Sequence, residues 1–345
     1  MEGDVEMKKG SKSRLSIILV LLLALIIPTG CGQATTTTAP EQGSTYPDHN
    51  IRLITGQGAG SSEDLAIRVV APALSQALGQ TVVPESMPGS GGRVGRSFVY
   101  KSKADGYTLG ILGQPSYSLG KLLYDGEYDV TNTTYLYQII EDYGVVLVKK
   151  DGRYKTFQDL LDASKKQQLV ISTDAGMGST QHLQSVLMKQ ITGIDFRLVP
   201  FESDGETLAG LVGDKVDAAM FTGTSNIVGY PDQVVPIVVF ADERVKNLPD
   251  VPTFKELGFD VPSVTISNGI VAPPDLPADV KQKLVDSLEK VVKDPEVISM
   301  AEKAGLAWNV VGPEEYEKKV KEIYADMEST YVPLMKKDME EAAKK

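Results

Sequence analysis

Residues 51–79, IRLITGQGAGSSEDLAIRVVAPALSQALG, give the clearest indication of the fold class. Residues 51–55 are mostly apolar or β-branched and predict a buried strand, and the glycines and serines that follow predict a tight turn. From residue 62 the apolar side chains recur at helical spacing until Gly79, a residue type that commonly ends helices. A strand, a short turn and a helix in this order form the repeating unit of α/β proteins.

The same alternation recurs along the chain in two series. The first is predicted to contain strands at 51–55, 81–85 and 107–113 and helices at 62–79 and 91–102. The second is predicted to contain strands at 144–150, 169–174, 196–201 and 216–221 and helices at 156–166, 179–193 and 204–215. Such units predict parallel sheets with right-handed crossovers, and two similar series predict two lobes. Three further helices are expected at 278–293, 296–304 and 313–337.

The composition argues against several classes of protein. A chain of 345 residues is long enough for one large or two medium domains with a substantial core. A formal net charge of −11, with no Lys/Arg cluster in the body of the chain, argues against nucleic-acid binding. One cysteine and two histidines exclude an internal disulfide framework and make a Cys/His zinc site implausible, so no metal or cofactor is expected.

The first 30 residues predict a secretory signal peptide. An apolar run at 15–27 is shorter than the roughly 20 residues of a membrane-spanning helix. Four basic residues precede it: Lys8, Lys9, Lys12 and Arg14. The acidic residues before Met7 are unusual for a signal, so Met7 is an alternative to Met1 as the true start.

The end of this segment resembles a bacterial lipoprotein signal. In such proteins the residue at the position of Cys31 becomes the first residue and carries the lipid. Ordinary cleavage and an uncleaved anchor are the alternatives. Residues 31–45 are polar and Thr-rich, and they predict a flexible linker between a membrane and the folded part.

Two strand–turn–helix junctions, at 55–68 and 172–183, are the candidate binding loops. Unpaired N–H groups at a helix start carry partial positive charge and can bind an anion, and glycines allow the backbone to approach it closely. Hydroxyl donors are available at Ser61, Ser62, Ser179 and Thr180. Helix capping alone is the alternative explanation for either loop. One such loop in each lobe favours a shared ligand cleft.

Enzymatic patterns do not fit. A dinucleotide-binding fingerprint fails because its third glycine position is Ser61, and the chain has no G-x-S-x-G motif. His182 falls early in a predicted helix, where capping or packing is the simpler role. Asp64 and Asp217 have simpler roles than a catalytic pair, and Trp308 is expected in the core. The chain is therefore predicted not to be an enzyme.

From residue 46 to residue 331 the chain resembles the solute receptors of tripartite tricarboxylate transporters, the Bug family. The resemblance rests on the order and spacing of several stretches. They are YPDHNIRLITGQGAGSSEDLAIR (46–68), VVPESMPGSGGRVG (82–95), ADGYTL (104–109), STDAGMGSTQHL (172–183), GDKVDAAM (213–220), ADERVKNLPDVPTFKELGFD (241–260) and GIVAPPDLPADVKQKL (269–284).

The resemblance implies a type II periplasmic-binding-protein fold, in which two α/β lobes are joined by two crossovers and close over a ligand. The lobes are expected at 46–147 plus 267–345 and at 148–266, with the second crossover within 225–268. The first and fourth stretches imply carboxylate-binding residues: Gly58, Ala59, Gly60, Ser61, Ser62 and Asp64, with Gly176, Met177, Gly178, Ser179 and Thr180. Variable residues that contact the rest of the ligand are expected at Gln114, Phe201, Asp204, Thr222 and Thr224.

The sequence departs from the family pattern in its ligand-facing parts. Ser61 replaces the second glycine of the family's AGG, and residues 56–57 replace a proline and an aromatic residue. Residues 201–203 replace a Tyr-Lys-Gly-like stretch, and 265–268 lack a common tryptophan. The reduced positive charge argues against a tricarboxylate such as citrate, and Glu202 and Asp204 would suit a ligand with an amino group.

The expected function is therefore that of an extracytoplasmic, membrane-anchored lipoprotein. It would capture a small carboxylate, either a di- or tricarboxylate or an amino acid, and deliver it to the membrane permease subunits of a transporter. A ligand-sensing receptor that docks on a signalling partner is the alternative, and an exported enzyme is a third.

Overall fold

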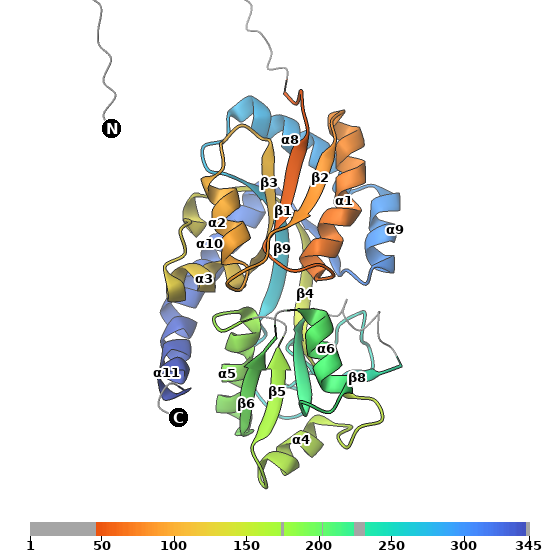
Figure 1. Ribbon diagram of the computed structural model, residues 1–345, viewed down its shortest axis with the longest axis vertical. Helices are drawn as coiled ribbons and strands as arrows, with labels where there is room; N and C mark the ends of the chain where they lie inside the picture. The colour runs from red at the N-terminus through yellow and green to blue at the C-terminus, as the bar shows by residue number, and fades with distance from the viewer. Residues whose placement is uncertain (1–45, 174–175, 202, 224–231, 343–345) are drawn as a thin grey trace, which may run out of the picture. The chain divides into compact units, whose positions relative to one another are not determined.

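The predicted first strand and helix are present as β1 (Ile51–Thr55) and α1 (Ser62–Leu78) in the computed structural model of the chain (Figure 1). Ser61 caps α1, and Gly79 ends it in the left-handed conformation with φ 72°. The structure describes residues 46–173, 176–201, 203–223 and 232–342, all within one compact unit, Ser44–Lys345. The predicted signal peptide, linker and Cys31 lie outside the described residues.

The first lobe is built on three parallel strands, with β1 between β2 (Val82–Ser86) and β3 (Thr108–Gln114). Helices α1, α8 (Ala278–Val292) and α9 (Pro295–Lys303) share its main hydrophobic cluster. Figure 1 shows α2 (Arg93–Lys101) and α3 (Ser116–Tyr124) on the opposite side of these strands. The short helix η1 (Val130–Asn132) follows α3.

The sheet is mixed, not wholly parallel as predicted. β9 (Thr265–Ala272) runs antiparallel to β3 and to β4 (Thr134–Lys149), and β10 (Trp308–Val311) runs antiparallel to β4. The 16-residue β4 is shared by both lobes. It pairs with β9 as far as Tyr143 and with β7 from Gly144 onward, so the predicted strand at 144–150 is the second part of a longer one.

The second lobe repeats the pattern, with β5 (Leu169–Thr173) parallel to β6 (Phe196–Pro200) and β7 (Ala218–Thr222). β8 (Val234–Val239) pairs with β4 and so belongs to this lobe's sheet. Its helices are α4 (Phe157–Ser164), α5 (Thr180–Thr192) and α6 (Asp204–Val212). The second predicted series therefore forms this lobe. β4 joins it to the first lobe, because this strand pairs with β7 here and with β9 there.

The C-terminal segment crosses from one lobe to the other. A single helix was expected at 313–337, but a π-helical turn, η2 (Met327–Tyr331), separates α10 (Pro313–Asp326) from α11 (Val332–Ala342). α10 packs against β4, whereas Val332 and Met335 belong to the hydrophobic cluster of the second lobe. The expected division placed all of this segment in the first lobe, whereas α11 packs against both α3 of the first lobe and α5 of the second.

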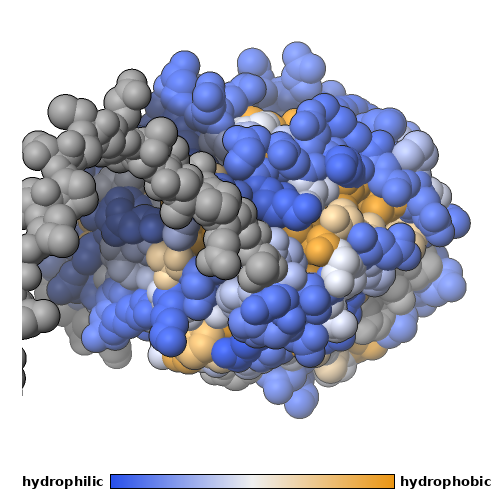
Figure 2. All heavy atoms as spheres, turned by 90° about the horizontal axis from the view of Figure 1, so that it is seen from above, coloured by the Kyte–Doolittle hydropathy of each residue, from blue (hydrophilic) through white to orange (hydrophobic). Residues whose placement is uncertain are grey.

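On the face of the first lobe that is seen from above, the described residues are mainly hydrophilic (Figure 2). In the view from above the first lobe, the described hydrophobic residues form small separate groups (Figure 2). No described helix combines the length and the apolar character needed to cross a membrane.

Candidate functional site

The first candidate loop is held by a network around Asp64. The carboxylate accepts hydrogen bonds from the Gly60 N–H (3.0 Å), the Ser86 hydroxyl (2.9 Å) and Arg68 Nε (3.0 Å). Burial alone would raise the pKa of Asp64, but the hydrogen bonds from Arg68, Gly60 and Ser86 outweigh it and lower the pKa. Asp64 therefore shapes the loop and does not line the pocket described below.

The second candidate loop is held by His182. Gly178, with φ 84°, donates its N–H to His182 Nδ1 (3.1 Å), and the Ser179 hydroxyl caps α5. His182 Nε2 lies 3.3 Å from Asp338 Oδ2 on α11. A β-carbon at Gly178 would overlap the ring of Tyr124 from the first lobe. This histidine is 1% exposed and has a structural role between the loop and α11.

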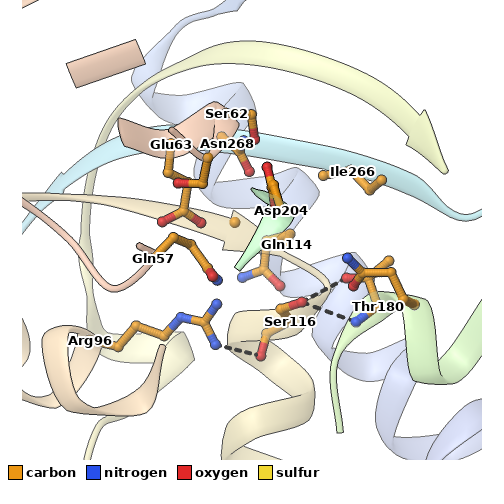
Figure 3. Close-up of a pocket in the computed structure, with 13 residues that line it drawn as sticks. Gln57, Ser62, Glu63, Arg96, Gln114, Ser116, Thr180, Asp204, Ile266 and Asn268 are labelled. Atoms are coloured by element: carbon orange, nitrogen blue, oxygen red, sulfur yellow. Dashed lines mark hydrogen bonds between the residues drawn. The ribbon is translucent and has the colours of Figure 1, made fainter. Parts of the chain in front are cut away.

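The two lobes meet at a pair of hydroxyl groups. The Ser116 hydroxyl, at the start of α3, lies 2.8 Å from the Thr180 hydroxyl and accepts the Thr180 N–H at 3.1 Å. Beside this contact is a pocket of about 40 Å³, shown in Figure 3. It is lined by Gln57, Ser61, Ser62, Glu63, Arg96, Gly113, Gln114, Ser116, Thr180, Gln181, Asp204, Ile266 and Asn268. Since one water needs roughly 10–15 Å³ by this measure, the pocket has room for about three waters.

One acidic and one basic side chain are buried in the pocket wall. Glu63 is 4% exposed and accepts a hydrogen bond from the Thr55 hydroxyl (2.7 Å). Arg96 is 2% exposed, and its Nη1 donates to the Ser116 carbonyl (3.0 Å). Burial raises the pKa of Glu63, although the nearby Arg96, the Thr55 hydroxyl and the Gly113 N–H act to lower it.

Close backbone packing brings Arg96 to this position. A β-carbon at Gly95 would lie 2.8 Å from the Gly56 Cα, and one at Gly92 would lie 3.1 Å from the Arg96 guanidinium carbon. Only glycine leaves room for the start of α2 to lie against the loop after β1. The guanidinium thereby reaches the pocket across the Gly92 backbone.

The structure places some of the expected site residues around the pocket and others away from it. Those in the lining are Ser61, Ser62, Gln114, Thr180 and Asp204. Those outside the lining are Gly58, Ala59, Gly60, Asp64, Gly176, Met177, Gly178, Ser179 and Phe201, while Thr222 ends β7. Thr224 lies outside the described residues. Phe201 instead packs against Gly210 and the hydrophobic cluster behind β5.

Several lining residues were not anticipated: Gln57, Glu63, Arg96, Gly113, Ser116, Gln181, Ile266 and Asn268. For Arg96 a signal was available. It shares the buried face of α2 with Gly95 and Val99, and a charged residue on such a face is rarely buried without a partner. Ile266 and Asn268 gave no comparable signal because their strand, β9, was not predicted.

Comparison with known proteins agrees with this architecture. Residues 66–328 match the model of the tripartite tricarboxylate transporter family receptor. A protein from Agrobacterium vitis, the UPF0065 protein in the TAR-I ttuE-ttuC' intergenic region, is 30% identical over 302 residues, covering 84% of this chain and 82% of the relative. BugT of Bordetella pertussis is 30% identical over 232 residues, covering 64% and 69%.

Solved structures show the same fold. One described as a periplasmic transporter is 29% identical, with a TM-score of 0.75, and covers 82% of this chain and 96% of its own. The periplasmic binding protein BugD, 24% identical, has a TM-score of 0.76 and covers 84% and 98%. The chain belongs to the receptor family of the tripartite tricarboxylate transporters.

Proposed function

We propose that this protein is an extracytoplasmic receptor that binds a small carboxylate between its two lobes and delivers it to the membrane permease of a tripartite transporter. The observation that carries the proposal is the pocket between the lobes, which is lined by the start of α1 (Ser61, Ser62) and the start of α5 (Thr180, Gln181). Both helix starts provide positive partial charge and hydroxyl groups, which favour an anion. The family and the fold are those of binding proteins.

The ligand class is supported by proteins of similar fold. MatC from Rhodopseudomonas palustris was solved with malate, and a second protein of that organism with adipate. Each is 22% identical to this chain, with TM-scores of 0.75 and 0.77, so the likeness is one of fold. A small carboxylate is the chemistry that these ligands share with an anion site at two helix starts.

Binding requires the cleft to open and close. A pocket of about 40 Å³ admits about three waters, and a molecule with several carbon atoms needs more space. β4 and the start of β9 connect the lobes where Tyr143 pairs with Thr265, and they are the natural hinge. Export and lipid attachment at Cys31 would place this cleft outside the membrane, next to the permease.

The test is identification of the ligand. Native mass spectrometry of the purified receptor reports any small molecule that remains bound. A thermal-shift screen then ranks propionate, lactate, alanine, glutamate, succinate and citrate, because a ligand raises the melting temperature by mass action. We expect at least one carboxylate to stabilise the protein. If no carboxylate co-purifies and none of the six shifts the melting temperature at millimolar concentration, the proposed function is wrong.

A further inference from the structure

Three buried nitrogen donors around the pocket lack a hydrogen-bond partner within the described part of the chain. They are Nε and Nη2 of Arg96 and Nε2 of Gln114. Arg96 is 2% exposed and Gln114 is 1% exposed, and both line the pocket. A buried donor without an acceptor is costly, and a charged one more so. Three such donors in one pocket therefore point to a ligand group that only accepts hydrogen bonds.

Both side chains are fixed by bonds that leave these donors facing the pocket. Arg96 Nη1 donates to the Ser116 carbonyl, and the guanidinium lies against Gly92. Gln114 Oε1 accepts the Ser118 hydroxyl at 2.7 Å, which assigns the outward-facing end to the amide nitrogen. In Figure 3 the guanidinium and the Gln114 amide lie on neighbouring sides of the pocket.

Two other arginines of the first lobe show what the open edge of Arg96 is suited to bind. Arg52 donates from Nε (2.9 Å) and Nη2 (2.7 Å) to the two oxygens of Glu85. Arg68 places Nε 3.0 Å from one oxygen of Asp64 and Nη2 2.9 Å from the other. In Arg96 the same pair of nitrogens has no acceptor at hydrogen-bonding geometry in the described residues, and the Tyr128 hydroxyl interacts with this side chain from outside the pocket lining. This edge of a guanidinium matches the two oxygens of a carboxylate.

The remaining charges limit what else the ligand can carry. Arg96 is the only basic side chain in the described lining, and the acidic ones are Glu63 and Asp204. In Figure 3 Arg96 and Asp204 lie on opposite sides of Gln114. A second ionised carboxylate would find no cation in this lining and would be repelled by Asp204, whereas an amino or hydroxyl group there could donate to it.

From these contacts we propose that Arg96 and Gln114 anchor the ligand, with the carboxylate bound side-on to Nε and Nη2 of Arg96. The ligand is a small acid with one carboxylate and a nearby amino or hydroxyl group that faces Asp204. This assignment rests on the proposed function, which requires only that some carboxylate binds in the cleft.

Isothermal titration calorimetry of wild type and three variants tests the anchor, using lactate, alanine, propionate, succinate and citrate as probes. Arg96→Lys keeps the charge but removes the two-nitrogen edge, and Gln114→Glu replaces the donor with an oxygen. Arg52→Lys is the matched control, because that edge is already occupied by Glu85. We expect lactate or alanine to bind wild type most tightly. Either pocket variant should raise the Kd about 10- to 100-fold, because it loses one or two charge-assisted hydrogen bonds to the carboxylate. The control should raise the Kd less than about twofold.

The outcomes separate the two proposals. If a probe binds and Arg96→Lys binds it as wild type does, the anchor is wrong while the proposed function stands. Tighter binding of succinate or citrate than of lactate and alanine overturns the single-carboxylate ligand. If no probe binds wild type, the anchor and its single-carboxylate ligand are wrong, and the proposed function fails with them only when no carboxylate co-purifies either. Should a variant not fold, as judged by thermal melting, a crystal structure of wild type with its best probe decides the matter. Carboxylate oxygens within about 3.2 Å of both Nε and Nη2 are expected, and their location elsewhere overturns the anchor.

Discussion

Replacing Glu63 with glutamine should remove the pH dependence of stability that this buried carboxyl imposes. Burial raises the pKa of Glu63 above its usual 4.5, the value expected in the unfolded chain. The folded state therefore holds a proton that the unfolded state releases, and the free energy of unfolding falls as pH rises above about 4.5. A glutamine side chain has nearly the same shape as the protonated carboxyl group and no proton to lose.

The expected size follows from linkage. Between pH 4.5 and the raised pKa, wild type should lose stability relative to Glu63→Gln by up to about 1.4 kcal/mol per pH unit. The variant must still satisfy the Thr55 hydroxyl and the Gly113 N–H with one amide oxygen, so it should also carry a constant cost of about 1 kcal/mol. Two ionisable side chains on neighbouring helices interact with Glu63. They are Arg96 on α2 and the buried Tyr316 on α10.

The assay is urea unfolding at half-unit intervals from pH 4.5 to 8.5, with ligand-free protein. Glu85→Gln is the contrasting control, because the hydrogen bond from Arg52 lowers the pKa of Glu85. Wild type should exceed this control by a nearly constant amount across this range, because the contribution of Glu85 is lost only below pH 4.5, as pH falls through the lowered pKa. Parallel wild-type and Glu63→Gln curves would refute the reasoning about Glu63.

Three further outcomes are expected. Ser116→Ala removes both hydrogen bonds to Thr180, so ligand should dissociate severalfold faster in stopped-flow measurements, and unchanged release would show that this contact does not hold the cleft closed. Gly178→Ala adds a β-carbon at φ 84° against Tyr124 and should lower the free energy of unfolding by about 1–3 kcal/mol. Gly193→Ala, at φ 71° with open space around it, should lower the free energy of unfolding less. Equal losses would show that overlap with Tyr124 is not the cause. Cys31→Ser should move the protein from the detergent phase to the aqueous phase in detergent partitioning of bacterial cells, and continued membrane association would exclude the lipid.

Local signals made much of the fold predictable. β1 and α1 follow directly from a short apolar run, a serine cap and a terminal glycine, each within a few residues of the element it defines. The first half of β4 was missed because its side chains are buried on both faces, which removes the alternation that identifies a strand. α3 was missed as well. It contains Ser118 and Gly120, and its buried Tyr117 indicates that tertiary packing stabilises it.

The candidate site also has one part that local sequence signals predicted and another part that they did not. Ser61, Ser62 and Thr180 were predicted because a helix start is recognisable in the sequence, and these residues line the pocket. Arg96 belongs to a helix that touches the pocket only because Gly56, Gly92 and Gly95 let distant segments pack closely. The helical pattern marks Arg96 as a residue on the buried face of α2, but no spacing rule connects residue 96 with the ends of β1 and β3, so its place in the pocket required the fold.

The same contacts explain how a ligand can favour the closed cleft. Closure without a ligand gains the two Ser116–Thr180 hydrogen bonds, together about 1–3 kcal/mol, but leaves Arg96 and Gln114 with donors that no described protein acceptor satisfies. In an open cleft bulk water reaches those donors, whereas the closed pocket admits only about three waters, so incomplete hydration of the donors opposes closure. A carboxylate supplies the missing acceptors and removes the cost of burying these donors, so the closed state is stabilised by the ligand that fits it.

Removing part of this cost by mutation should also favour the closed state. Gln114→Leu deletes an unsatisfied donor, and by small-angle scattering the ligand-free variant should be more compact than wild type while binding carboxylates more weakly. A variant as open as wild type would mean that the unpaired donors do not control closure.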